Sequence, residues 1–194
     1  MNYLDAIIAR RSRYALKNTI NLPEDKVIEA IKDSIKHTPS AYNTQSTRAV
    51  ILLGENHKKL WNIVKEALLA KIGAERFVAT EAKIDKSFLS GYGTVLFFID
   101  EDVVKEYAEK ISDNFYGWAT ESAGMAQMNV WGALSSLGLG ASLQHYNPLI
   151  DKKTKEAFDI PANWKLLSQM PFGDILSEPG AKTFKDIDEL VKVK

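Results

Sequence analysis

The stretch Thr94-Val95-Leu96-Phe97-Phe98-Ile99 predicts the clearest β-strand of the chain. Its side chains are mostly β-branched or aromatic, the types that strands favour, and it lies between Gly93 and Asp100. The run is far too short to cross a bilayer as a helix. It therefore indicates a strand inside a globular protein.

Helical and extended patterns alternate on both sides of this strand. Apolar residues at helical spacing predict helices, and short apolar runs between turn-forming residues predict strands. The strands are few and the charged tail is long, which favours the α+β class with a small sheet over a doubly wound parallel sheet. The predicted helices cover 4–8, 23–37, 60–68, 77–89, 113–137 and 148–158, the further strands cover 49–53, 141–146 and 164–170, and an extended tail covers 177–194.

Length and composition limit the classes of function. The 194 residues, 45% of them hydrophobic, suit one compact domain over residues 1–194. The 25 basic residues balance 25 acidic ones, and this zero net charge argues against nucleic acid as a partner. The chain has no cysteine, which excludes disulfides, thiolate catalysis and cysteine-bound metals. Residues 1–5 lack the apolar stretch of a signal peptide, so we expect a cytoplasmic protein with no membrane span.

The motifs of several enzyme classes are missing. Gly138-Leu139-Gly140 follows a predicted helix, and Leu143 stands where a dinucleotide fingerprint needs its third glycine. The three histidines, His37, His57 and His145, have no metal-ligand spacing, and the nucleophile motif of serine hydrolases does not occur. We therefore expect no metal and no catalytic side chain, and an organic cofactor that carries the chemistry.

Three segments could hold such a cofactor. Arg10-Arg11-Ser12-Arg13 offers guanidinium forks that match a phosphate, although a basic cluster can also be a solvated helix end. Residues 39–45 offer amide groups that both donate and accept, although they can also form a turn bonded to its own backbone. Residues 142–146 end a predicted strand, where backbone often faces a ligand. A single histidine such as His145 is more often structural than catalytic.

Taken together, these segments resemble the FMN-dependent nitroreductase family. The resemblance rests on Arg10-Arg11-Ser12, on Pro39-Ser40 with Asn43 and Gln45, and on Gly138-Leu139-Gly140-Ala141-Ser142. Other stretches are similar to its short fatty-acid-repression and copper-induced subgroup, and they cover 14–16, 143–151 and 180–184. These stretches follow one another in the family's order over nearly the whole chain.

The resemblance implies a nitroreductase-like fold in a homodimer. A small antiparallel central sheet would be flanked by helices, and the long helices would form the interface. The C-terminal tail, from about residue 177, would be domain-swapped onto the partner. Two FMN molecules would lie between the subunits.

The resemblance also implies which residues bind FMN. One group would hold its phosphate and ribityl chain: Arg10, Arg11, Ser12 and Lys182. A second group would reach the flavin from the opposite subunit: Pro39, Ser40, Asn43 and Gln45. Leu143 and Gln144 would lie against the isoalloxazine ring, and the backbone N–H groups of His145 and Tyr146 would point at flavin N5 and O4.

One position departs from the wider family. Tyr14 stands where many members have a basic residue at the pyrimidine edge of the flavin, so it can offer only a neutral hydrogen bond. Arg48 is a candidate substitute for the missing charge. Phe115 and Trp118 could form an apolar wall for the substrate, or they could be core or interface residues.

The implied activity is a ping-pong transfer of electrons from NAD(P)H through FMN to small electron-poor nitroaromatics or quinones. No side chain has to act as an acid or base, because the protein supplies orientation and N–H dipoles. Two alternatives remain open at this point. One is a flavin-binding regulatory or stress-sensing protein with incidental reductase activity, and the other is a dimerisation module without a cofactor.

Overall fold

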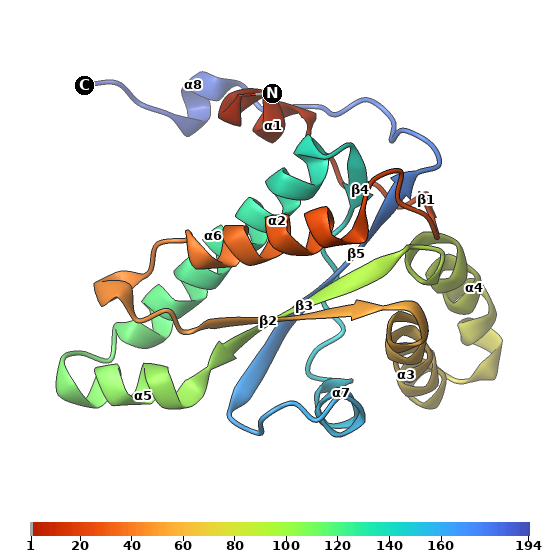
Figure 1. Ribbon diagram of the computed structural model, residues 1–194, viewed down its shortest axis with the longest axis horizontal. Helices are drawn as coiled ribbons and strands as arrows, with labels where there is room; N and C mark the ends of the chain where they lie inside the picture. The colour runs from red at the N-terminus through yellow and green to blue at the C-terminus, as the bar shows by residue number, and fades with distance from the viewer. Residues whose placement is uncertain (1) are drawn as a thin grey trace.

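A five-stranded antiparallel sheet organises the computed structural model, which describes residues 2–194 (Figure 1). Its order is β1-β5-β3-β2, and β4 pairs with β5. The strands are β1 (Leu16–Lys17), β2 (Thr47–Leu53), β3 (Gly93–Asp100), β4 (Leu139–Ala141) and β5 (Trp164–Ile175). The small antiparallel sheet predicted from the sequence is confirmed.

The central strand β3 is buried along its whole length because helices cover both faces of the sheet. Val95 and Phe97 pack on one face against the helices α2 and α6, and Leu96 and Phe98 pack on the other face against α3 and the segment that follows α4. Successive strand residues point to opposite faces, so a strand covered on both sides becomes a continuous apolar run. This double cover explains why residues 94–99 gave the strongest signal in the sequence.

The helices lie close to the predicted ones, with two additions, α5 and the short α8 in the tail. The helix α5 was not predicted, and the segment 38–46 contains a short 3₁₀ turn. The helices are α1 (Tyr3–Ala9), α2 (Glu24–Lys36), α3 (Gly54–Ile72), α4 (Ala74–Ile84), α5 (Glu101–Lys110), α6 (Phe115–Ser136), α7 (Asp151–Ala157) and α8 (Ile187–Leu190), with the 3₁₀ turn η1 (Ala41–Asn43) and the π-helical turn η2 (Asp85–Leu89).

Two predicted strand boundaries were wrong. The strand expected at 141–146 is β4, which ends at Ala141 and is followed by an isolated bridge at Gln144. The strand expected to stop before Pro171 continues to Ile175. The Pro171 carbonyl accepts a hydrogen bond from the Ser142 N–H at 3.4 Å, so its nitrogen faces the side where β4 has just ended. The N–H that proline lacks is therefore not needed by the neighbouring strand β3.

The tail after β5 is exposed, as predicted, although it contains the short helix α8. It carries apolar side chains that its own chain leaves uncovered, among them Phe184 at 79% exposure and Val193 at 96%. Within residues 2–194, no helix has both the length and the apolar character that crossing a membrane requires.

Candidate functional site

The arginine cluster lies where the N-terminal segment meets β4. Arg10 ends α1, and the following residues form a parallel bridge in which the Arg13 N–H donates to the Ala141 carbonyl at 2.9 Å. Gly140 permits this approach, because a Cβ there would lie 2.7 Å from the Leu16 side chain and 3.2 Å from the Arg13 Cβ. The glycine that failed as a dinucleotide fingerprint thus has a packing role.

The tail closes over this cluster. Arg11 Nη2 donates to the Gly180 carbonyl at 2.7 Å, and Arg13 Nε pairs with Glu178 Oε2 at 3.0 Å. A cavity of about 410 Å³ results. Five predicted cofactor residues line this cavity: Arg10, Arg11, Ser12, Tyr14 and Lys182.

Positive charge in this cavity is not balanced by the protein. No acidic side chain lines the cavity, and the one nearby ion pair, Arg13 with Glu178, leaves Arg10 and Arg11 without a carboxylate partner in residues 2–194. Burial, followed by repulsion from Arg11 and Arg13, lowers the pKa of Arg10 from its ordinary value. Like charges held together without counter-charge indicate an anion-binding site.

The Arg10 guanidinium stacks on the ring of Trp131, which lies on α6. The guanidinium carbon lies 4.5 Å from the centre of the Trp131 ring, a cation–π arrangement. The Arg10 Nε is buried and has no hydrogen-bond partner within the described chain. The guanidinium is therefore fixed in place with donor capacity left over, which fits a phosphate group.

The second predicted segment, residues 39–45, has a strained backbone. Tyr42, Asn43 and Gln45 have φ values of 52°, 53° and 49°, in the left-handed region that residues other than glycine seldom adopt. Ser40 Oγ accepts the Gln45 N–H at 2.9 Å and holds the loop in this form. Such strain is concentrated at binding and active sites. Pro39, Ser40, Gln45 and Arg48 line a cavity of about 470 Å³ beside it, and Asn43 does not.

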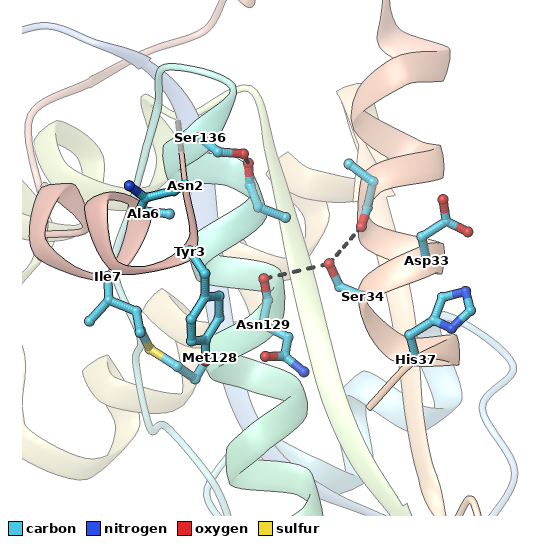
Figure 2. Close-up of a pocket in the computed structure, with 13 residues that line it drawn as sticks. Asn2, Tyr3, Ala6, Ile7, Asp33, Ser34, His37, Met128, Asn129 and Ser136 are labelled. Carbon is cyan, nitrogen blue, oxygen red and sulfur yellow. Dashed lines mark hydrogen bonds between the residues drawn. The ribbon is translucent and has the colours of Figure 1, made fainter. Parts of the chain in front are cut away.

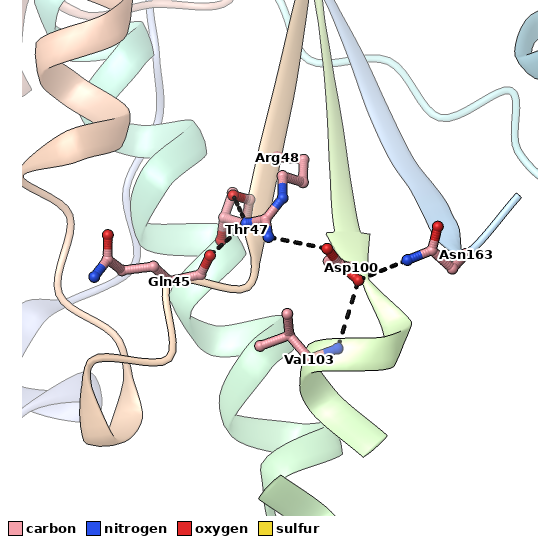
Figure 3. Close-up of polar contacts among 6 residues, drawn as sticks. All are labelled: Gln45, Thr47, Arg48, Asp100, Val103 and Asn163. Carbon is pink, nitrogen blue, oxygen red and sulfur yellow. Dashed lines mark hydrogen bonds and ion pairs between the residues drawn. The ribbon is translucent and has the colours of Figure 1, made fainter. Parts of the chain in front are cut away.

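Arg48 is already engaged inside its own chain (Figure 3). Its Nη2 pairs with Asp100 Oδ2 at 2.9 Å, and Nη1 donates to the carbonyls of Gln45 and Thr47. Asp100 also accepts from Asn163 Nδ2 at 2.8 Å. Asp100 therefore balances the charge of Arg48, which anchors the start of β2 and also lines the loop cavity.

The third predicted segment, residues 142–146, is held by Gln169, a residue that was not predicted. Gln144 and Gln169 exchange two backbone hydrogen bonds, at 2.8 and 2.9 Å. The fully buried Gln169 side chain accepts the Tyr146 N–H through Oε1 at 2.9 Å. The N–H of His145 has no acceptor in residues 2–194. Of the two N–H groups expected to face the flavin, the structure thus leaves only that of His145 available.

Phe115 and Trp118, the candidate substrate residues, lie at the start of α6. Phe115 is 2% exposed, and its ring lies 5.5 Å from Tyr42 and 5.0 Å from Trp118. Within one chain it is a core residue that supports the strained loop, whereas Trp118 is half-buried.

A further cavity, of about 460 Å³, lies between α1, α2 and α6 (Figure 2). Figure 2 shows Tyr3 and Ile7 of α1 on one side and, on the other, Ser34 of α2 and His37, which directly follows α2. Small residues, Gly132 and Ala133, form its floor on α6. Tyr3 and Ile8 of the neighbouring helix are 70% and 77% exposed. The arginine cavity and the loop cavity share no lining residue.

Comparison with known proteins agrees with the fold. The sequence model of the nitroreductase family matches residues 7–174. Nitroreductase CinD from Lactococcus lactis, solved in complex with nicotinic acid, is 41% identical, with a TM-score of 0.92 and 100% coverage of both chains. The same protein has been solved with chloramphenicol and with 4-nitrophenol.

Nitroreductase FRM2 of Saccharomyces cerevisiae is 36% identical over 190 residues, which cover 94% of this chain and 93% of the relative. The resemblance drawn from the short sequence motifs is confirmed by these matches. The chain therefore belongs to the nitroreductase family, and an oxidoreductase role follows from that membership.

Proposed function

We propose that this protein is an FMN-dependent reductase that acts as a homodimer and passes electrons from NAD(P)H to small nitroaromatic or quinone acceptors. The observation that supports the proposal most strongly is the arginine cavity. Within residues 2–194, no carboxylate balances Arg10 and Arg11 there, and the buried Arg10 Nε has no hydrogen-bond partner. A doubly charged phosphate ester would balance the two arginines and accept a hydrogen bond from the Arg10 Nε.

The residues of the cavity suit the tail of FMN. Arg10 and Arg11 would grip the phosphate through guanidinium forks, Ser12 would add a hydroxyl, and Lys182 would add charge from the C-terminal side. Bound FMN would supply the redox chemistry, taking hydride from the nicotinamide and giving electrons to the acceptor that replaces it. Tyr14 lines the same cavity and would offer a neutral hydroxyl to the pyrimidine edge.

The segment 142–146 would position the reactive edge. Gln169 holds the backbone on both sides of His145 through Gln144 and Tyr146. The free His145 N–H would then donate to the flavin beside N5, while Leu143 and Gln144 would cover one face of the ring. A fixed N–H dipole stabilises negative charge that develops during reduction without needing to reorganise.

A second copy of the chain would complete the site. Three residues of the second predicted group, Pro39, Ser40 and Gln45, line a different cavity from the arginine cluster, which supports a site whose second group comes from a partner chain. In a dimer, the partner's Ser40 and the partner's Gln45 would approach the ring and ribityl chain. The exposed apolar residues of α1, which lines the cavity of Figure 2, and those of the tail suit burial against the other subunit.

The substrate class is inferred from the relatives. CinD has been solved with nicotinic acid, chloramphenicol and 4-nitrophenol, each a small molecule with an aromatic ring. Similar electron-poor acceptors would use the same space as the nicotinamide in this protein, giving ping-pong kinetics in the cytoplasm.

The test is the absorption spectrum of the purified protein before and after anaerobic NADH or NADPH. We expect a yellow protein whose flavin absorbance bleaches within seconds and returns when a nitroaromatic is added. A bound flavin that does not bleach would favour the regulatory alternative. A colourless protein that does not bind added FMN would refute the proposal.

A further inference from the structure

A fourth cavity, of about 290 Å³, adjoins the segment that would face the flavin. It lies between the last turns of α3, which contribute Leu68 and Lys71, and residues 145–149. His145 lines it, and the His145 N–H is the backbone donor that the protein leaves free. A molecule bound in this cavity would therefore lie beside the proposed site of electron transfer.

Apolar surfaces form the walls of this cavity. Four residues with apolar or aromatic side chains line it: Leu68, Tyr146, Pro148 and Leu149. The Tyr146 ring is held edge-on against Trp61, with the centroids 5.9 Å apart, and against Phe88 at 6.3 Å. A mostly apolar space at the lower end of ligand-pocket sizes suits a single aromatic ring.

The polar groups of the cavity favour a negative charge. Lys65, earlier on the same helix, is paired with Asp85 at 2.9 Å, whereas Lys71 forms no ion pair with any carboxylate of the described chain. No acidic side chain lines the cavity. Burial raises the pKa of Tyr146 to about 12, so its hydroxyl stays protonated and can act as a donor.

Lys71 has a simpler alternative role. It lies in the last turn of α3, where a cation stabilises the helix dipole. Lys83 has the equivalent position in the last turn of α4 and lines none of the cavities described above. The two lysines therefore form a matched pair for separating helix stabilisation from ligand binding.

We propose that this cavity binds the carboxylate end of an aromatic acceptor, with Lys71 as the specificity-determining residue. The ring would lie between Tyr146 and the Leu68–Leu149 wall, and the reducible group would face the flavin edge to which the His145 N–H would donate. Aromatic acids, as a class, would then be preferred over neutral aromatics of the same shape. This inference rests on the proposed function, because it takes the His145 segment as the flavin-facing edge.

The test compares 4-nitrobenzoate with 4-nitrobenzamide, which has the same shape without the charge. For the FMN-loaded protein we expect kcat/KM to favour the acid, and Lys71→Gln to lower that preference about threefold to fivefold, as for a solvent-exposed charge pair. The amide should be unaffected by Lys71→Gln, and Lys83→Gln should leave both substrates unaffected. Because the pair formed by Lys71 and the ligand carboxylate would be exposed to solvent, the preference for the acid should also decline as salt is added.

A binding measurement makes the test independent of turnover. The oxidised holoprotein is titrated with benzoate and with benzamide in a calorimeter. Lys71→Gln should lower the affinity for benzoate by the same factor and leave the affinity for benzamide unchanged. Equal affinity for the acid and the amide, or a benzoate affinity that Lys71→Gln leaves unchanged, would overturn the inference. Failure of the proposed function would look different, since neither nitro compound would then be reduced.

Discussion

Removing Arg10 and Arg11 together should release FMN while leaving the fold intact. Neither guanidinium is paired with a carboxylate, and each would make charge-assisted hydrogen bonds to the phosphate. Such bonds contribute about 1.5–3 kcal/mol each, so the loss of one arginine should weaken FMN binding by about 10- to 100-fold. Losing both should weaken it by about 10²- to 10⁴-fold if the two contributions are independent.

Arg13→Ala is the matched control for this double variant. Its charge is already compensated by Glu178, whose side chain is 63% exposed, so the pair contributes at most about 1 kcal/mol. We expect Arg13→Ala to bind FMN within about fivefold of the unaltered protein. A conservative variant, Arg10→Lys, should fall between the extremes, because it keeps the charge but loses the fork and weakens the contact with the Trp131 ring.

The assay is fluorescence titration of flavin-free protein with FMN, with thermal unfolding measured by circular dichroism as the check on folding. Riboflavin, which lacks the phosphate, should bind all variants with similar weak affinity. A double variant that stays fully yellow after gel filtration would show that the phosphate lies elsewhere. An equal loss of FMN and riboflavin binding would show that the substitutions only disturb the fold.

Three further predictions concern the residues around the site. Gln45→Gly removes a side chain from a backbone with φ of 49°, so flavin-free thermal stability should be retained or rise, while FMN affinity falls; a drop in the unfolding temperature would contradict the strain argument. Burial lowers the pKa of His57 from 6.5, so the folded state favours the neutral ring, and the unfolded chain binds the proton first as the pH falls below 6.5. The free energy of unfolding should therefore decrease from pH 6.5 downward. Measured by urea unfolding, its decrease from pH 7.5 to pH 5.5 should be smaller in His57→Gln than in the unaltered protein. An equal decrease in both proteins would rule out His57 as a cause. Asp100→Asn leaves Arg48 without its carboxylate and should cost about 1–3 kcal/mol of unfolding free energy, an effect that Arg48→Met in the same chain should partly reverse.

The parts of the fold that could be predicted have local signals. The strand β3 is apolar along its length because both of its faces are covered, and α2 and α6 show apolar stripes or small residues at helical spacing. The helix α5 was missed because most of its residues are charged. Its signals were present in the sequence, since Asp100 caps it by accepting the Val103 N–H and Val104 and Ala108 form its buried side. Asp100 was interpreted only as the end of the preceding strand.

The residues of the candidate site also differ in whether the sequence next to them carries a signal. The arginine cluster was visible because its residues are adjacent in sequence, and Lys182 could be added only through the family resemblance. Gln169 and Asp100 were not predicted as site residues, because their roles depend on contacts with Tyr146 and Arg48, far from them in the chain. Nothing in the residues next to Gln169 indicates that its side chain accepts a backbone N–H from another segment. Such partners become visible only when the strands are paired.

The most direct test of a flavin site shared between two chains is complementation between two deficient subunits. One subunit carries Arg10→Ala with Arg11→Ala, and the other carries Ser40→Ala with Gln45→Ala; heterodimers are isolated through two different affinity tags. Each parent homodimer should bind little FMN, whereas the heterodimer contains one intact site and should bind about one FMN per two chains, as two-fold symmetry requires. A folded heterodimer that remains as colourless as its parents would contradict the shared site.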